Sequence, residues 1–358
     1  MKGVWKKINK KVSPGRLFYP PEWIVLGVNN ACNLHCKMCD VGLGNSDTVF
    51  GRNLTGTRPM NMPLEMVKSI VDQLARSWSS TRLGFAFTEP LIWPGLVEAV
   101  AYAEDRGIGT AVTTNGLTLD TLAEPLSDAG LKDLYLSIDG TADIHDHIRG
   151  RKGAFGRAIN GVKQMLGRTN RPRISIFCVI TPWNIDNLEP FLKEMAGLPL
   201  ETVGFMHTNF TTQKVADTHN ALWGKAYPAT PSNIGPFDPA DIDLKKLQKA
   251  ISDLKAFSAP FDISFSPELE TLDQLERFYN QPDVLIGSSC IDIDRTLMVK
   301  SDGRVIPCHG RCYDLTIGNV TEQTLTEIWN AEAIADLRLA LRSSGGLLPA
   351  CSRCCSAF

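Results

Sequence analysis

No stretch of this 358-residue chain reaches the ~18 consecutive apolar residues that a membrane-spanning helix needs. A strong charge bias is also absent, because 37 Lys and Arg residues stand against 39 Asp and Glu residues, giving a net charge of −2. Without a large basic surface, binding of nucleic acid through bulk electrostatics is not expected. The first sixteen residues are basic, but the apolar core of a signal peptide does not follow them. We therefore expect a cytoplasmic protein with neither a membrane span nor a nucleic-acid partner.

Cysteine is scarce in the middle of the chain and concentrated near its two ends. Of the ten cysteines, only Cys178 lies between the two groups, and we expect it to be a small apolar residue of the fold's interior. A secreted disulfide scaffold would be small and evenly cross-linked. Because thiolates select zinc, copper(I) or iron–sulfur clusters, the grouping indicates metal ligation.

The first two thirds of the chain alternate short β-rich runs with segments of helical apolar spacing. This alternation predicts an α/β fold of parallel βαβ units. Six units are too few for an eight-stranded barrel, so we expect a partial (β/α)6 barrel or an open sheet. The predicted strands are Trp23–Val28, Leu83–Phe87, Thr110–Thr114, Leu134–Ile138, Ile174–Ile180 and Thr202–Met206.

We divide the chain into an N-terminal arm (1–22), the partial barrel (23–210), a connector with helices (211–285) and a small C-terminal module (286–358). In the last of these, Asp302-Gly303 indicates a hairpin. Thr324 and Glu327 form a capping box for a helix that we expect to run to about Arg342. The arm has apolar residues at helical spacing beside a tryptophan, a pattern compatible with a membrane surface. A helix packed on the barrel, or a frayed arm, is the interpretation we favour.

The first cysteine group is Cys32-x3-Cys36-x2-Cys39, directly after the first predicted strand. Three thiolates on one short loop can hold three irons of a 4Fe–4S cube and leave the fourth iron open. An open iron can chelate the amine and carboxylate of a small molecule. A structural zinc site with a distant fourth ligand, or three unrelated thiols, are the alternatives.

This spacing, at this place in a βα pattern, resembles the radical S-adenosylmethionine (SAM) superfamily. The resemblance implies a SAM-binding 4Fe–4S cluster on Cys32, Cys36 and Cys39. It also implies reductive cleavage of SAM to methionine and a 5′-deoxyadenosyl radical, which abstracts hydrogen from the substrate. The electron would come from a flavodoxin- or ferredoxin-type donor.

Polar residues after the next predicted strands fit the same family. Phe87-Thr88-Glu89-Pro90 resembles the family's Gly-Gly-Glu-Pro with both glycines replaced, and Met38 stands where many members have an aromatic residue. Each stretch, taken alone, is also compatible with an ordinary turn after a strand. The SAM-site residues that the resemblance implies are Met38, Thr88, Glu89, Pro90, Thr114, Asn115, Ser137, Asp139, Arg149 and Thr181.

The second cysteine group resembles the SPASM/Twitch extension of radical SAM enzymes. The resemblance implies one auxiliary 4Fe–4S cluster held by Cys290, Cys308, Cys351 and Cys354. A zinc ribbon made of Cys308, Cys312, Cys351 and Cys354 is the alternative. The leftover Cys312 and Cys355 are candidate alternative ligands or hydrogen-atom donors. His207 is a candidate substrate contact or base, although a surface or structural histidine is the more ordinary interpretation.

The substrate is the least determined part of the prediction. Only 31 residues precede Cys32, too few for the leader-peptide-binding domain that peptide-modifying relatives often carry. We therefore expect a small polar substrate, such as a sugar, cyclitol or natural-product intermediate, that undergoes oxidation or epimerisation. A peptide- or protein-modifying maturase and a non-catalytic zinc- or cluster-binding module are the alternatives.

Overall fold

One curved sheet organises the molecule, as seen in a computed structural model that describes residues 2–56, 58–235, 238–307, 310 and 313–358. Its strand order is β10-β9-β8-β1-β2-β3-β4-β5-β6-β7. The strands are β1 (Trp23–Leu26), β2 (Arg82–Phe85), β3 (Thr110–Thr114), β4 (Asp133–Ser137), β5 (Arg173–Ile180), β6 (Thr202–His207), β7 (Asp262–Ser266), β8 (Thr296–Val299), β9 (Arg304–Ile306) and β10 (Gly318–Asn319).

The predicted partial barrel is confirmed, and the sheet extends beyond it on both sides. Strands β1 to β6 are parallel neighbours in chain order, as βαβ units require. On one side β7, from the segment predicted to hold only helices, pairs parallel to β6. On the other side β8 pairs parallel to β1, and β9 and β10 follow antiparallel. The C-terminal segment is thus part of the same sheet.

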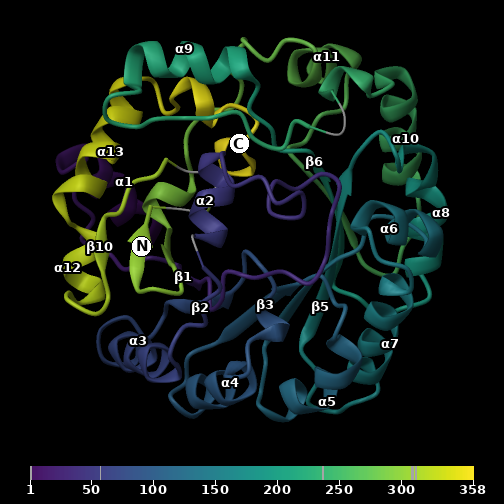
Figure 1. Ribbon diagram of the computed structural model, residues 1–358, viewed down its shortest axis with the longest axis horizontal. Helices are drawn as coiled ribbons and strands as arrows, with labels where there is room; N and C mark the ends of the chain where they lie inside the picture. The colour runs from purple at the N-terminus through teal and green to yellow at the C-terminus, as the bar shows by residue number, and fades with distance from the viewer. Residues whose placement is uncertain (1, 57, 236–237, 308–309, 311–312) are drawn as a thin grey trace.

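Helices cover the outer face of the sheet and close its flanks (Figure 1). On α3 the buried residues Val67, Ile70, Val71 and Leu74 recur at the helical period, which explains why this segment folds as a helix against the strands. The helices are α1 (Lys2–Val12), α2 (Val49–Thr55), α3 (Leu64–Ser77), α4 (Leu96–Asp105), α5 (Leu119–Asp128), α6 (Ala142–Arg149), α7 (Ala154–Leu166), α8 (Leu188–Met195), α9 (Gln213–Trp223), α10 (Leu244–Ala256), α11 (Leu272–Tyr279), α12 (Leu325–Trp329) and α13 (Glu332–Ser343).

The C-terminal segment confirms the predicted hairpin and capping box but not the single long helix. Gly303 takes φ +86° in the turn between β8 and β9, and Thr324 caps α12 reciprocally with Glu327. The helix then ends at Trp329, and α13 starts a new one. The break has a physical cause, because the Trp329 carbonyl accepts a hydrogen bond from the buried Arg338 guanidinium at 2.9 Å.

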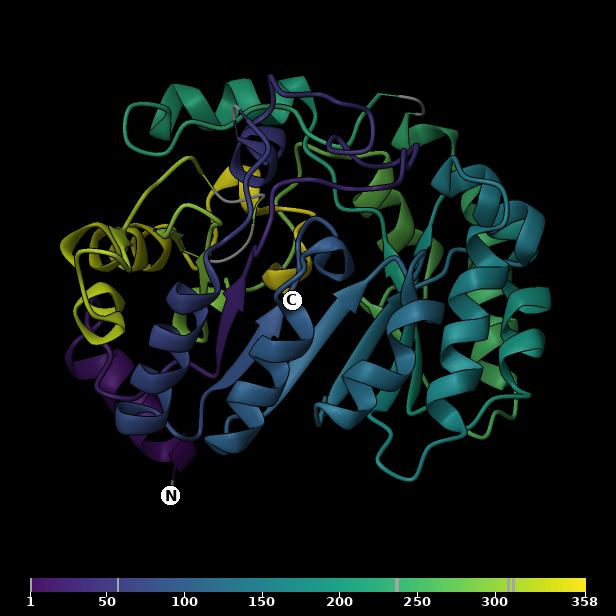
Figure 2. The ribbon, with the colours of Figure 1, turned by 60° about the horizontal axis from the view of Figure 1, so that its bottom comes forward.

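The two ends of the barrel carry different features (Figure 2). The loops that follow the strands, including the cysteine loop after β1, lie at the end toward which the parallel strands point. Helix α1 lies at the opposite end, beside the start of β1. Within the described ranges, every helix is too short or too polar to cross a lipid bilayer.

Candidate active site

The first cysteine group lies on a half-buried loop that begins where β1 ends. Cys36 and Met38 are buried, and Cys32 and Cys39 pack at the edge of the same apolar cluster. The Cys39 amide donates to the Cys36 carbonyl at 3.2 Å, and the Lys37 amide donates to the Ile148 carbonyl at 2.9 Å. These bonds fold the loop into a turn and fix it to the C-terminal end of α6.

The electrostatics of this loop fit a metal cluster. Burial raises the pKa of all three thiols, and that of Cys39 reaches about 11. Cys36 further raises the pKa of Cys32 and of Cys39, so the thiolates lie close enough to repel one another. Three neighbouring thiolates therefore need positive charge to be stable together, and bound iron supplies it. Three sulfur donors on one loop suit three corners of a 4Fe–4S cube.

A buried ion pair holds a cation against the loop. Arg149 donates from Nε to Asp139 Oδ2 at 2.5 Å, and its Nη1 lies 3.7 Å from Cys36 Sγ. Asp139 Oδ1 accepts from the Val179 amide at 2.9 Å, which fixes the carboxylate at the ends of β4 and β5. Burial lowers the pKa of Arg149, but Asp139 and Cys36 more than offset it and the pKa is raised, so the guanidinium stays charged.

Glu89 ties three loops of the site together. Its side chain is fully buried, and Oε1 accepts from Thr114 Oγ1 at 2.6 Å and from the Leu91 amide at 3.0 Å. Oε2 accepts from the Asn115 amide at 2.8 Å. The Asn115 side chain continues to Asn33 Oδ1 at 2.8 Å and approaches Cys32 Sγ at 3.9 Å. Glu89 therefore positions the loops after β2 and β3 against the cysteine loop, while its direct contact with a cofactor stays a prediction.

The segment before Glu89 has a backbone conformation that favours glycine, although neither of the two residues before Glu89 is a glycine. Phe87 has φ +87°, in the region that favours glycine. Thr88 Oγ1 donates to Asn29 Oδ1 at 2.6 Å, and Asn29 Nδ2 donates to the Glu89 carbonyl at 2.7 Å. Pro90 begins a 3₁₀ turn that Glu89 caps. Asn29 is absent from the predicted site, although its place after a predicted strand was a usable signal.

Some of the second cysteine group is brought together by backbone pairing. The Cys290 amide donates to the Gly346 carbonyl at 3.1 Å, and the Ile291 amide donates to the Ser356 carbonyl at 2.9 Å. Cys290 thus lies beside the tail that carries Cys351, Cys354 and Cys355. Cys308 and Cys312 lie outside the described residues, so the auxiliary-cluster set and the zinc-ribbon alternative stay predictions. Among the residues that are described, no three His, Cys, Asp or Glu side chains are grouped to hold a single metal ion.

Comparison with known proteins decides the family. The model of the radical SAM superfamily matches residues 27–195, and that of the SPASM iron–sulfur cluster-binding domain matches residues 290–355. Residues 27–195 belong to the radical SAM superfamily. Its cofactors are accordingly SAM and 4Fe–4S clusters, as the cysteine groups predict.

Relatives of this radical SAM protein act in different pathways. It is 27% identical to an AdoMet-dependent heme synthase of Methanosarcina barkeri, over 89% of this chain and 85% of that protein. It is 23% identical to the sporulation killing factor maturation protein SkfB of Bacillus subtilis, over 89% of this chain and 67% of that protein. The structure of Streptococcus suis SuiB bound to SAM shares the fold, with a TM-score of 0.63, 16% identity, and coverage of 94% and 72%.

Two of three further predicted residues of the radical SAM site have protein partners. Ser137 ends β4 and is half-buried. Thr181 is fully buried, and its hydroxyl and amide donate to Asn184 Oδ1 at 3.1 and 2.8 Å. His207 ends β6 as a buried residue whose Nδ1 lies 2.7 Å from the Tyr279 hydroxyl, and burial lowers its pKa to about 3. The catalytic and binding roles of these residues stay predictions.

A small cavity beside Phe87 contains a lysine at the end of the barrel where the parallel strands end. It has a volume of about 80 Å³ and is lined by Asn29, Phe87, Met298, Lys300 and Arg304. Lys300 follows β8 and is 8% exposed. Burial lowers the pKa of its ammonium, and Arg304 lowers it further. Polar residues directly after a parallel strand are candidates for the site. Lys300 would have been such a candidate if β8 had been expected to pair with β1.

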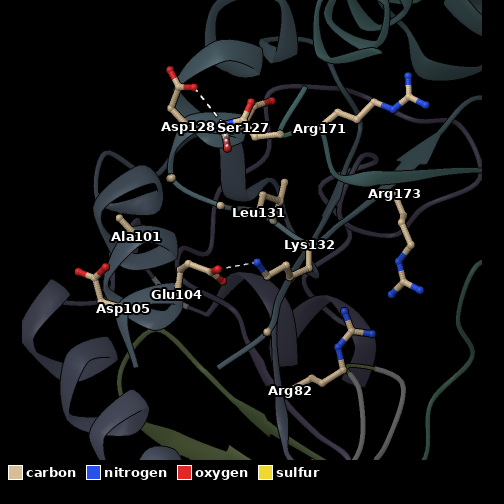
Figure 3. Close-up of a pocket in the computed structure, with 14 residues that line it drawn as sticks. Arg82, Ala101, Glu104, Asp105, Ser127, Asp128, Leu131, Lys132, Arg171 and Arg173 are labelled. Atoms are coloured by element: carbon tan, nitrogen blue, oxygen red, sulfur yellow. Dashed lines mark hydrogen bonds and ion pairs between the residues drawn. The ribbon is translucent and has the colours of Figure 1, made fainter. Parts of the chain in front are cut away.

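A large pocket lies apart from this site. It has a volume of about 910 Å³ and lies at the starts of the strands, where Arg82, Lys132 and Arg173 line it together with Glu104 and Asp128 (Figure 3). Glu104 pairs with Lys132, and the buried Asp133 pairs with Arg82 and Arg173. The charges of this pocket therefore largely compensate one another, and it holds none of the predicted site residues.

Proposed function

We propose that this radical SAM enzyme is an oxidoreductase or isomerase acting on a small polar substrate that carries an anionic group. The observation that supports this substrate class is Lys300, a buried ammonium in the cavity beside Phe87. Lys300 makes no ion pair within the part of the chain that the structure describes, whereas Arg304 is paired with Asp302 at 2.7 Å. A buried, unpaired cation is costly, and a carboxylate or phosphate of the substrate would compensate it.

The residues of the cysteine loop have distinct proposed roles. Bound cluster and SAM together supply hydrogen-atom abstraction from an unactivated carbon. Cys32, Cys36 and Cys39 would hold the cluster, and Arg149 keeps a fixed positive charge against Cys36. Met38 supplies an apolar wall. A flavodoxin- or ferredoxin-type protein would deliver the electron.

The second cysteine group would determine the outcome. If Cys290, Cys308, Cys351 and Cys354 hold an auxiliary cluster, that cluster can take one electron from a substrate radical, which gives a net two-electron oxidation. If instead Cys355 donates a hydrogen atom, the product is an epimer, and an electron and a proton from the donor system restore the thiol.

A peptide or protein side chain is the second candidate substrate. The similarity to SkfB over 89% of this chain favours it. An acidic side chain or terminal carboxylate of a peptide would suit the same lysine. The abundance of cysteine in two groups suits the reducing cytoplasm, where we place the enzyme.

Anaerobic purification and reduction test the enzyme class. We expect roughly eight irons per chain from two cubes and release of 5′-deoxyadenosine from SAM on reduction. Cys36→Ala should abolish this release, whereas Cys351→Ala should leave some cleavage that is uncoupled from product. Zinc in place of iron, or no SAM cleavage by reduced protein that contains iron, would contradict the enzyme class. Equal and complete loss in both variants would indicate that the second group is structural.

Lys300→Met tests the substrate class, with Lys245→Met on the exposed face of α10 as the matched control. The readout is the concentration of candidate substrate that gives half-maximal stimulation of SAM cleavage. For a substrate with a carboxylate, Lys300→Met should raise this concentration roughly tenfold to a hundredfold, because a charge-assisted hydrogen bond is lost. Its uncharged amide analogue should lose little. Equal behaviour of the two variants would exclude Lys300 as the anion contact.

A further inference from the structure

Exposed apolar side chains gather on α1 and the segment that follows it. Large apolar residues with high exposure are Val4 (62%), Trp5 (70%), Ile8 (46%), Val12 (77%) and Phe18 (77%). These are half of the ten exposed large apolar residues found across the described residues. Scattered exposed apolar side chains are normal for a protein surface, but a contiguous set marks an interaction site. We call these five residues the α1 patch.

Four of the five residues of the α1 patch line a groove at the end of the barrel opposite the cysteine loop, namely Trp5, Ile8, Val12 and Phe18. The groove has a volume of about 690 Å³, and Tyr19, Pro20, Glu22 and Ser80 complete its walls. Glu22 directly precedes β1, and Ser80 lies just before β2, so the groove is at the starts of the strands. Figure 2 shows α1 at this end, away from the loops that follow the strands. A surface that covers the α1 patch would therefore leave the candidate active site open.

Positive charges outnumber negative ones around the α1 patch. Residues 1–21 contain six Lys and Arg residues and no Asp or Glu. Lys6 pairs with Glu22 and Lys10 with Asp294, both at 2.7 Å. Lys11 and Arg16 are exposed and make no ion pair within the described parts of the chain. The cations at this end thus exceed their acidic partners, in contrast to the compensated pocket of Figure 3.

We infer that the α1 patch docks the enzyme on the surface of an anionic phospholipid membrane. Exposed Trp and aliphatic residues on a short helix, flanked by lysines, suit insertion at the headgroup boundary. The excess of cations suits the negative potential of anionic lipids. A second copy of this chain is a poorer occupant, because two copies of a segment with six cations and no acids would repel each other. One such helix predicts weak, reversible and salt-dependent binding.

Vesicle co-sedimentation of the anaerobically purified full chain tests this inference. The vesicles contain phosphatidylcholine either alone or with about a third phosphatidylglycerol, a fraction chosen to give a clearly anionic surface. We expect binding to the anionic vesicles that weakens as salt is raised, and little binding to phosphatidylcholine alone. The double variant Trp5→Ser/Phe18→Ser should lower the partition coefficient roughly tenfold or more, since both side chains are already exposed and their loss affects burial on the membrane. Lys11→Glu should weaken binding to a similar degree.

Matched controls separate the α1 patch from general surface effects. Leu222→Ser removes an equally exposed apolar residue on α9, and Lys245→Glu reverses an exposed charge on α10. Both should bind vesicles like the unmodified chain, and circular dichroism should show every variant folded. The inference is overturned if the unmodified chain does not bind anionic vesicles at low salt, or if the control and patch variants bind equally. Dimerisation that Trp5→Ser/Phe18→Ser abolishes, without vesicle binding, would assign the patch to a second copy instead.

Discussion

Replacing Gly150 with alanine should loosen the cysteine loop without touching a cysteine. Gly150 follows α6 with φ +68°, and a Cβ added there would lie 2.7 Å from the His35 carbonyl oxygen. His35 directly precedes Cys36, so a shift of its backbone also shifts the most buried thiol of the group. Gly153 provides the matched control, because it has φ +82° and nothing within 4 Å of an added Cβ.

The two substitutions share one energetic term and differ in another. Each places alanine in a left-handed conformation, which costs about 1–2 kcal/mol in the free energy of unfolding. Gly150→Ala adds an overpacking term of about 1–3 kcal/mol, because the contact is a backbone oxygen that cannot rotate away. We therefore expect a loss of about 2–5 kcal/mol for Gly150→Ala and of about 1–2 kcal/mol for Gly153→Ala.

Two assays on anaerobically prepared protein separate these terms. Urea unfolding measures the free energy of unfolding, and the rate of iron release to a ferrous chelator measures the integrity of the cysteine loop. Gly150→Ala should hold less iron and release it faster than Gly153→Ala, whose iron content should match the unmodified chain. If the two variants release iron at the same rate, the cysteine loop does not depend on the close approach of Gly150 and His35.

Two other substitutions test the buried charges of the fold. Asp139→Asn should lower the free energy of unfolding by about 3–5 kcal/mol, because Arg149 would remain buried without its partner. The exposed pair of Asp120 and Arg157 supplies the control. There, Asp120→Asn should lower the free energy of unfolding by about 1 kcal/mol or less, as measured by urea titration. Similar costs for both would show that the inner pair is solvated. His207 binds a proton below about pH 6.5 when unfolded but has a pKa of about 3 when folded, so its contribution to stability is present above pH 6.5 and is lost as the pH falls toward 3. His207→Gln should therefore reduce the slope of unfolding free energy against pH between pH 6 and 4 by up to about 1.4 kcal/mol per pH unit, and an unchanged slope would contradict a buried neutral histidine.

Local sequence pattern predicted the strands whose residues are buried on both faces. The limits of β3 agree with the prediction, and those of β5 and β6 differ from it by one residue. Strand β7 was missed because it lies at the edge of the sheet and its residues are mostly half-buried, so Asp262–Ser266 has no continuous apolar run. The pairing of β8 with β1 joins residues more than 250 positions apart, and no local pattern contains that information.

The positions of the site residues were predictable, but their hydrogen-bond partners were not. Because parallel strands end at one edge of the sheet, Glu89, Asn115 and Asp139 could be assigned to one site. The sequence does not show that Thr114 and Asn115 donate hydrogen bonds to the Glu89 carboxylate. Nor does it show that the Tyr279 hydroxyl lies within hydrogen-bond distance of His207. These partners depend on where separate loops cross in three dimensions. The sequence analysis could therefore name candidate site residues. The structure then distinguishes residues that hold loops in place through hydrogen bonds from residues that line a cavity.

Phe87 occupies a backbone conformation that favours glycine, at a position where the family motif has one. A phenylalanine at φ +87° carries strain of about 1–3 kcal/mol, which persists only where surrounding contacts offset it. Those contacts are Leu54 of α2, Met298 of β8 and Ile306 of β9, with Val41 from just beyond Cys39 packed on the same cluster. A glycine would satisfy the backbone but would remove the side chain that joins these elements. The cluster therefore links the cysteine loop, the loop after β2 and the C-terminal hairpin by packing.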